Sequence, residues 1–233
     1  MQNKNLEDFQ SGQVLLFDKP LNWTSFDLVN KARWLIRKKF KIKKIKVGHA
    51  GTLDPLATGL VIICTGKFTK RIEEFMGQEK EYTGTIQLGA TTPSYDLETE
   101  INQTFPTDHL TEEKIKAATC QFIGIIQQQP PVFSALKKDG KRLYEFARKG
   151  EEVDIPAREV NIREFEITGI DCASVHFRVS CSKGTYIRSL ANDFGKALQT
   201  GGHLTKLCRT RIGDYQIGDT ITIEDFEASL QPE

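Results

Sequence analysis

The chain has 233 residues and a formal net charge of +1, with 39% hydrophobic and 27% charged residues. These values are ordinary for a soluble globular protein of one large domain or two small ones. No apolar run is long enough to span a membrane, and the polar residues 1–12 are unlike a signal peptide. We therefore expect a soluble, cytoplasmic protein with no membrane partner.

The five cysteines are scattered and include no C-x-x-C pair. This spacing argues against a disulfide framework and against a structural zinc site. The four histidines have no metal-ligand spacing either, and the sequence lacks a phosphate-binding loop and a G-x-S-x-G motif. We therefore expect no metal and no nucleotide cofactor.

The first predicted elements are a short buried strand at residues 14–17 and a helix that follows it. The strand is expected to end at Asp18-Lys19-Pro20, and Ser25 is expected at the N-cap of the helix. The helical periodicity predicts an apolar face made of Phe26, Val29, Ala32, Leu35 and Ile36.

Positive charge is concentrated in the second half of that helix and the residues after it. Between residues 31 and 46 no acid interrupts nine cations: Lys31, Arg33, Arg37, Lys38, Lys39, Lys41, Lys43, Lys44 and Lys46. The rest of the chain is consequently net acidic. Such asymmetry favours a polyanionic partner, and a solvated helix end is the alternative interpretation.

The middle of the chain is predicted as an alternation of short elements. We expect a loop at 47–58, a buried strand at 60–64, a short helix at 68–76, a strand at 82–88 and a polar connection at 90–107.

The last third contains predicted helices with recognisable ends. Thr111 is expected to cap one helix, and a second, from about Arg142 to Lys149, is expected to end at Gly150. An alternating strand at 175–181, a helix at about 186–198 and short strands through Ile223 follow.

The irregular order of helices and half-buried strands predicts the fold class. It favours an α+β fold with a mixed, largely antiparallel central sheet flanked by helices, rather than a doubly wound parallel sheet. Since no repeat or linker interrupts the chain, residues 1–233 are interpreted as one catalytic domain.

Three segments carry candidate functional residues. In GHAGTLDPLATG, residues 48–59, Pro55 favours an extended backbone at Asp54, whose carboxylate is a candidate nucleophile or base. Arg188, in KGTYIR, has the geometry to pair with a carboxylate, and Tyr82, in KEYTG, is a candidate base-stacking residue. Taken alone, each has an ordinary interpretation: a turn former, a surface arginine and a packing tyrosine.

Five segments together resemble the TruB family of bacterial tRNA pseudouridine synthases, in the family's order. They cover most of residues 18–209 and read KPLNWTS from Lys19, GHAGTLDPLATGL from Gly48, KEYTGTIQLGATTPSYD from Lys80, QPPVFSALKKDGKRLYEFARKG from Gln129 and SKGTYIRSLANDFG from Ser182. The resemblance implies the pseudouridine synthase fold and isomerisation of the T-loop uridine of tRNA, position 55, without a cofactor.

The resemblance also implies roles for individual residues. Asp54 is the expected catalytic carboxylate, Arg188 its ion-pair partner, and Tyr82 the ring that stacks on the flipped uracil. Further residues are expected to bind the substrate or the RNA: His49, Thr52, Lys19, Lys70, Tyr186, Leu207, Arg37, Lys38, Lys39 and Lys43. The expected partner is the T arm of tRNA, without a protein partner, and the protein is expected to be a monomer.

The chain departs from the family's pattern at three places. Asn22 stands where the family usually has glycine, so a different turn is expected after Pro20. Leu207-Cys208-Arg209 replaces a Leu-Arg-Arg run, with one cation lost. Residues from about 210 to 233 are too few for a full RNA-binding PUA domain and are interpreted as a vestige of one.

Three other functions are also compatible with the sequence. A non-catalytic tRNA-binding protein of the same fold would tolerate Asp54→Asn, and an RNA glycosidase would release free uracil. A sister synthase acting on rRNA would isomerise a different target.

Overall fold

The computed structural model describes residues 5–134, 136–138, 140–147, 151 and 153–231. The chain divides into two compact units. Unit 1 comprises the residues up to Tyr82 and those from Leu207 onward, and unit 2 comprises Thr83–Lys206. Strands β4 (Lys80–Leu88) and β12 (Gly202–Ile212) each contain residues of both units.

Unit 1 is built on strand β3, whose residues are almost all buried. Strands β1 and β2 pair with β3 in antiparallel fashion, and β12 pairs with it in parallel, with Arg209 opposite Gly59. Its elements besides β4 and β12 are α1 (Leu6–Ser11), β1 (Val14–Lys19), α2 (Ser25–Phe40), β2 (Val47–His49), β3 (Thr58–Thr65), the 3-10 helix η1 (Gly66–Arg71), α3 (Ile72–Gly77), β13 (Tyr215–Gln216), η3 (Ile217–Asp219) and α7 (Ile223–Ser229).

Helix α2 covers part of this sheet and begins with a capping box. The Thr24 side chain accepts the Asp27 N–H, and Asp27 accepts the Thr24 N–H in return. Leu28, Ala32 and Ile36 are buried without measurable exposure. The helix therefore presents an apolar stripe to unit 1 and its cations to solvent.

Unit 2 contains the antiparallel strands β10 and β11, with β7 on the outer side of β10 and β4 beside β11. Its remaining elements are β5 (Ala90–Thr91), β6 (Gln103–Thr104), α4 (Glu112–Ala118), η2 (Thr119–Phe122), β7 (Gly124–Gln128), β8 (Lys137–Lys138), β9 (Lys141–Arg142), α5 (Leu143–Ala147), β10 (Arg158–Asp171), β11 (Ser174–Cys181) and α6 (Ile187–Ala197).

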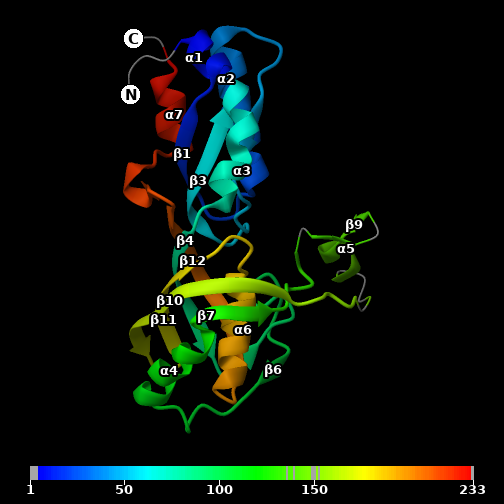
Figure 1. Cartoon of the computed structure of the whole chain (residues 1–233), viewed down its shortest axis with the longest axis vertical. Coiled ribbons are helices and arrows are strands. Elements are labelled where there is room, and N and C mark those ends of the chain that lie inside the picture. Colours follow the sequence, from blue (N-terminus) through cyan, green and yellow to red (C-terminus); the bar gives the residue numbers. More distant parts are fainter. Residues whose placement is uncertain (1–4, 135, 139, 148–150, 152, 232–233) are drawn as a thin grey trace. The chain divides into compact units, whose positions relative to one another are not determined.

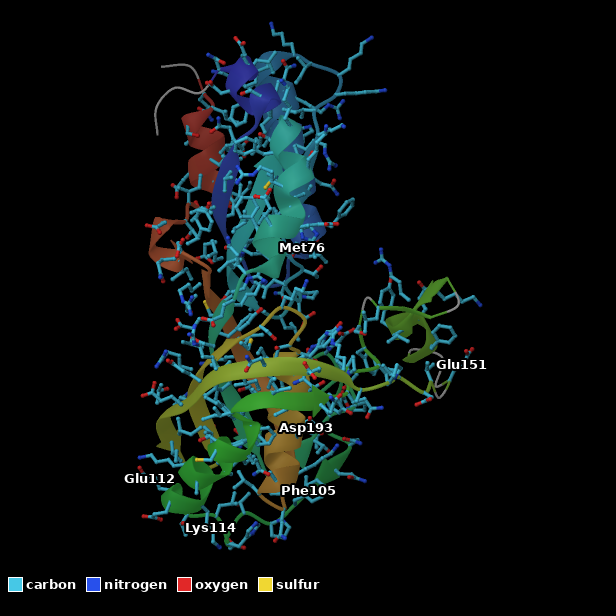
Figure 2. The ribbon with its side chains drawn as sticks, viewed as in Figure 1. Met76, Phe105, Glu112, Lys114, Glu151 and Asp193 are labelled. Atoms are coloured by element: carbon cyan, nitrogen blue, oxygen red, sulfur yellow. The ribbon has the colours of Figure 1, made fainter. Side chains whose placement is uncertain are left out.

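Helix α6, orange in Figure 1, provides much of the core of unit 2. Phe194 on α6 packs against Phe165 on β10, with ring centroids 5.2 Å apart, and Phe165 packs edge-on against Phe177 on β11. In contrast, α4 lies at the surface, and its residues Glu112 and Lys114 are labelled in Figure 2.

The predicted fold class is confirmed: the structure is α+β with a sheet that is mostly antiparallel. The cap at Thr111 and the strand at 175–181 are also confirmed. In the described part of the chain no helix combines the length and the apolar character that crossing a membrane requires.

Several predicted elements need correction. The N-cap of α2 is Thr24 rather than Ser25, because Thr24 makes the capping hydrogen bonds while Ser25 turns inward. Phe26 is 60% exposed and does not belong to the buried face, where Leu28 takes its place. The loop predicted at 47–58 contains β2, and the connection at 90–107 contains β5 and β6.

The C-terminal prediction was also incomplete. Residues 202–212 form one long strand, and a helix, α7, begins at Ile223. The end of the predicted helix at Gly150 lies outside the described residues, and α5 extends over Leu143–Ala147.

Candidate active site

Asp54 lies half-buried on a loop between β2 and β3 in unit 1. At the start of the loop, directly after β2, the Ala50 N–H donates a hydrogen bond to the carbonyl of Ile62 at 2.8 Å. A turn follows Asp54, where the Ala57 N–H donates to the carbonyl of Asp54 at 3.1 Å. We call residues 50–57 the aspartate loop. Thr52 and Pro55 in this loop are exposed, so its tip faces solvent.

Lys19, at the end of β1, holds the loop after Asp54. Its buried ammonium donates to the carbonyls of Trp23, Pro20 and Pro55, at 2.6, 2.8 and 3.4 Å. The Asn22 N–H donates to the same Pro55 carbonyl at 2.8 Å. Asn22 has φ +66°, a left-handed conformation that glycine favours and asparagine tolerates. The asparagine at this position is therefore compatible with a turn that would suit glycine.

Arg209, on β12, holds the loop before Asp54. Its side chain is 1% exposed, and it donates from Nε to the carbonyl of Leu60 at 2.8 Å. Its two terminal nitrogens approach the carbonyls of Thr52 and Gly51, both at 3.4 Å. No carboxylate among the described residues forms a salt bridge with Arg209, so carbonyl oxygens compensate much of the cost of burying this charge.

Ser25 and Gly59 complete the support of the aspartate loop. The Ser25 hydroxyl accepts the Leu53 N–H at 2.8 Å and lies 3.3 Å from the carbonyl of the same residue. Gly59 has φ +105°, and a Cβ there would lie 2.4 Å from the Arg209 carbonyl oxygen. A glycine is therefore required where β12 passes β3, which explains the last glycine of the motif.

Burial and neighbouring charges shift two pKa values around this loop. Burial lowers the pKa of Lys19 to about 8, although the negative charge of Asp54 acts in the opposite direction. Burial also lowers the pKa of His49, and the charge of Arg209 contributes. The Nδ1 atom of His49 is buried without a hydrogen-bond partner in the described structure. His49 is consequently favoured in its neutral form.

Arg188 lies in the first turn of α6 in unit 2 and is also buried. Its Nε is 3.5 Å from Oδ2 of Asp96, and its Nη1 donates to the carbonyl oxygens of Phe133 at 2.9 Å and Ser94 at 3.3 Å. Sequence reasoning did not identify Asp96 as a functional residue. The available signal was its place at the end of the KEYTG…PSYD segment, since a carboxylate is a common partner of a buried arginine.

Tyr186, directly before α6, is held by two residues of neighbouring strands. The Gln128 side chain accepts the Tyr186 N–H at 2.8 Å and donates to its carbonyl at 3.1 Å. The Arg158 guanidinium lies 4.6 Å from the centroid of the Tyr186 ring and donates to the Gly184 carbonyl. Gln128 thus holds the backbone of Tyr186 and Arg158 contacts its ring, and neither contact was predicted from the sequence.

The remaining predicted residues occupy different environments. Tyr82 on β4 and Leu207 on β12 are 9% and 8% exposed, and Lys70 in η1 is exposed. The predicted RNA-binding cations are exposed at the end of α2 and in the following loop: Arg37, Lys38, Lys39 and Lys43. Within unit 1 the structure brings Lys19, Ser25 and Arg209 together around the aspartate loop. The ion pair between Asp54 and Arg188, which belong to different units, stays a prediction.

Comparisons with protein families match both parts of the sequence. Residues 37–187 match the model of the TruB family pseudouridylate synthase N-terminal domain. Residues 188–232 match the tRNA pseudouridylate synthase B C-terminal domain. In the described part of the chain, no group of three or more histidine, cysteine or acidic side chains is placed to hold a metal ion.

Similar proteins extend over almost the whole chain. The tRNA pseudouridine synthase B of Flavobacterium johnsoniae is 62% identical over 97% of this chain and 99% of its own length. The protein of the same name from Phocaeicola vulgatus is 59% identical over 94% and 93%.

Solved structures have the same fold. A chain in a Cbf5-Nop10-Gar1 complex superposes with a TM-score of 0.71 at 30% identity, over 94% of this chain. A chain in an archaeal box H/ACA sRNP Nop10-Cbf5 complex superposes with a TM-score of 0.68. This chain spans about half of either, 54% and 56% of their lengths. With two family models and near-complete relatives in agreement, the chain belongs to the TruB family of pseudouridylate synthases.

Proposed function

We propose that the chain isomerises the T-loop uridine of tRNA, position 55, to pseudouridine, with Asp54 as the catalytic carboxylate. The observation that carries this proposal is the near-complete match to tRNA pseudouridine synthase B of Flavobacterium johnsoniae. The support of the aspartate loop agrees with it, since buried side chains hold backbone carbonyls on both sides of Asp54. A carboxylate held in this way is pre-organised for chemistry.

The reaction breaks the N1–C1′ bond of the uridine, turns the uracil and joins C5 to C1′. The proton on C5 leaves and N1 regains one, so the product is an isomer and no other reactant is consumed. Asp54 acts on the nucleoside during bond cleavage, and the positive charge of Lys19 lies close enough to interact with the carboxylate of Asp54. In this proposal Arg188 pairs with Asp54, and Asp96 orients the Arg188 guanidinium.

The substrate base must leave its stack to reach Asp54, at a cost of a few kcal/mol. In this proposal Tyr82 stacks on the flipped uracil, which stabilises the complex by about 1–3 kcal/mol. His49 occupies space in the T loop as a neutral side chain. Thr52, Lys70, Tyr186 and Leu207 line or support the bound nucleotide.

The exposed cations near the end of α2 bind RNA phosphates. Arg37, Lys38, Lys39 and Lys43 form this surface. We expect the affinity for tRNA to decrease with salt, with a log–log slope of about −0.7 to −0.9 for each phosphate neutralised. The proposal includes a monomer acting in the cytoplasm without a protein partner, with residues 1–233 as one catalytic domain.

The test uses an unmodified T-arm transcript incubated with the protein and no added cofactor. Pseudouridine is mapped by carbodiimide modification and primer extension, and a transcript with cytidine at the target position is the control. We expect primer extension to stop at the T-loop uridine of the unmodified transcript, and not at the same position of the cytidine control. Tight binding without a stop would replace the proposal with a non-catalytic tRNA-binding function, and release of free uracil would indicate a glycosidase.

A further inference from the structure

The outer face of α2 carries two exposed aromatic side chains. Phe26 is 60% exposed and Trp34 is 48% exposed. They lie eight residues apart, which places them about 12 Å apart along the helix and less than a quarter turn apart around it. Leu28, Leu35 and Ile36 bury the opposite side of the same helix. Two large aromatic rings exposed on a highly charged helix face indicate a binding surface rather than a packing defect.

Cations surround the Trp34 ring. The ammonium groups of Lys31 and Lys38 lie 5.0 and 4.8 Å from the Trp34 ring centroid, and the Arg37 side chain is exposed beside them. Lys31 also pairs with Glu227 at 2.9 Å. Arg33 differs, because it donates to Asn30 and to the carbonyl of Val47 and thereby secures β2. The Trp34 end of the face is consequently both aromatic and strongly positive, whereas the exposed Asp27 lies next to Phe26.

The other end of this face adjoins the aspartate loop. Ser25, the residue before Phe26, exchanges hydrogen bonds with Leu53, and Leu53 precedes Asp54. The surface therefore leads directly away from the candidate catalytic residue along α2.

Resting on the proposed function, we propose that Phe26, Trp34, Arg37 and Lys38 bind unpaired nucleotides of tRNA that lie outside the T arm. Bases stack on the two rings, and the cations contact the phosphates that connect them. Alternating aromatic and basic side chains are the usual chemistry for unpaired RNA, because every base has a face that can stack. A paired stem offers phosphates but few accessible base faces. An acidic protein segment would pair with the cations but would have no base to stack on Trp34.

Tryptophan fluorescence reports on this surface directly. The chain has two tryptophans, so the variant Trp23→Phe leaves Trp34 as the sole one. Titration of that variant with full-length tRNA is expected to quench the emission strongly, and titration with an isolated T-arm hairpin is expected to quench it little. Equal quenching by both RNAs, or by neither, would overturn the proposal. Quenching by polyglutamate as strong as by tRNA would assign the face to an acidic protein segment instead.

Binding measurements with Trp34→Ala complete the test. We expect the Kd for full-length tRNA to rise about five- to tenfold, with the Kd for the T-arm hairpin within about twofold of wild type. Trp34→Phe should restore most of the loss. Lys114→Ala is the control for loss of an exposed side chain outside the proposed surface, since Lys114 lies on α4 in unit 2 (Figure 2). An unchanged Kd with full-length tRNA would contradict the proposal.

The same preparations separate this inference from the proposed function. Wild-type turnover of the T-arm hairpin tests the catalytic assignment without the outer nucleotides. If the hairpin is converted and Trp34→Ala has no effect on tRNA binding, the α2 surface alone is refuted. If the hairpin is not converted by wild type, the catalytic assignment is refuted whatever Trp34 does.

Discussion

Asp54 and Arg188 are held by different means in their two units. Asp54 lies on an irregular loop whose carbonyl oxygens are held by side chains from β1 and β12. Arg188 lies on α6, where the packing of Phe194 and neighbouring residues fixes the helix, and Asp96 adds an ion pair. The position of the carboxylate therefore depends on a few polar contacts, while the position of the arginine depends on the core. Substitutions that remove single contacts should distinguish the two regions.

Among substitutions of the residues that support Asp54 and Arg188, the largest effect is expected from breaking the ion pair of unit 2. Asp96→Asn keeps the shape of the side chain but removes the negative charge beside the buried Arg188. Loss of one partner of a buried pair typically costs about 3–5 kcal/mol. We expect the single-turnover rate of pseudouridine formation to decrease at least about a hundredfold.

The control for Asp96→Asn is Asp193→Asn, on the same helix as Arg188 (Figure 2). Burial raises the pKa of Asp193, and its nearest cation is Lys196 at 3.8 Å. We expect the Asp193 variant to react at nearly the wild-type rate. Equal losses in both variants would indicate general damage to α6 instead of a role for the ion pair.

A smaller effect is expected from Arg209→Lys in unit 1. Lysine keeps the charge but lacks the planar fork that reaches the carbonyls of Gly51 and Thr52. We expect kcat to decrease about ten- to thirtyfold because the aspartate loop loses contacts worth about 1.5–2 kcal/mol. The Kd for tRNA should remain within about twofold.

Arg211→Lys is the matched control for that substitution. Arg211 lies two residues further along β12 and pairs with Glu79 at 2.8 Å, in a partly exposed position away from the aspartate loop. We expect less than a twofold change in kcat. A drop in the Arg211 variant as large as in the Arg209 variant would contradict the specific role of Arg209.

The pH dependence of Lys19 should give the smallest effect. Its pKa is lowered to about 8, so Lys19 loses its charge as pH rises through this value, and the attraction between Lys19 and the carboxylate of Asp54 is lost. We expect the single-turnover rate to decline about three- to tenfold above pH 8. Lys19→Arg should remove this decline, because a guanidinium stays charged. An identical decline in both proteins would assign it to another group.

Stability should respond to the same titration in the opposite direction. The lysine of the unfolded chain keeps its proton up to about pH 10.5, so between pH 8 and 10.5 the unfolded state binds more protons. The free energy of unfolding should consequently rise with pH in this window through Lys19. Urea denaturation of wild type and Lys19→Arg across this pH range measures the contribution, and a decrease specific to wild type would contradict it.

Local patterns were sufficient to predict much of the fold. The apolar runs at β1 and β3, the alternation of β11 and the cap at Thr111 are local signals, and the structure contains each of them. Phe26 was placed on the wrong side of α2 because the helical period alone does not decide which edge of an apolar stripe reaches the core.

The candidate site was less accessible to sequence reasoning. Asp54, Tyr82 and Arg188 were selected by their motifs, but the contacts of Arg209 with residues 51 and 52 and of Arg188 with Asp96 join distant parts of the chain. Such partners depend on strand register and on helix packing, which no local window contains. The burial of Lys19 and its lowered pKa follow from the same long-range packing.

The most direct test of the central claim compares wild type with Asp54→Asn on the same T-arm RNA. Single-turnover formation of pseudouridine is measured with enzyme in excess, and binding is measured in parallel. We predict that the asparagine variant binds the RNA within about threefold of wild type and forms product at least about a thousandfold more slowly, or not at all. Product formation by Asp54→Asn at a rate close to wild type would contradict the assignment of Asp54 as the catalytic carboxylate.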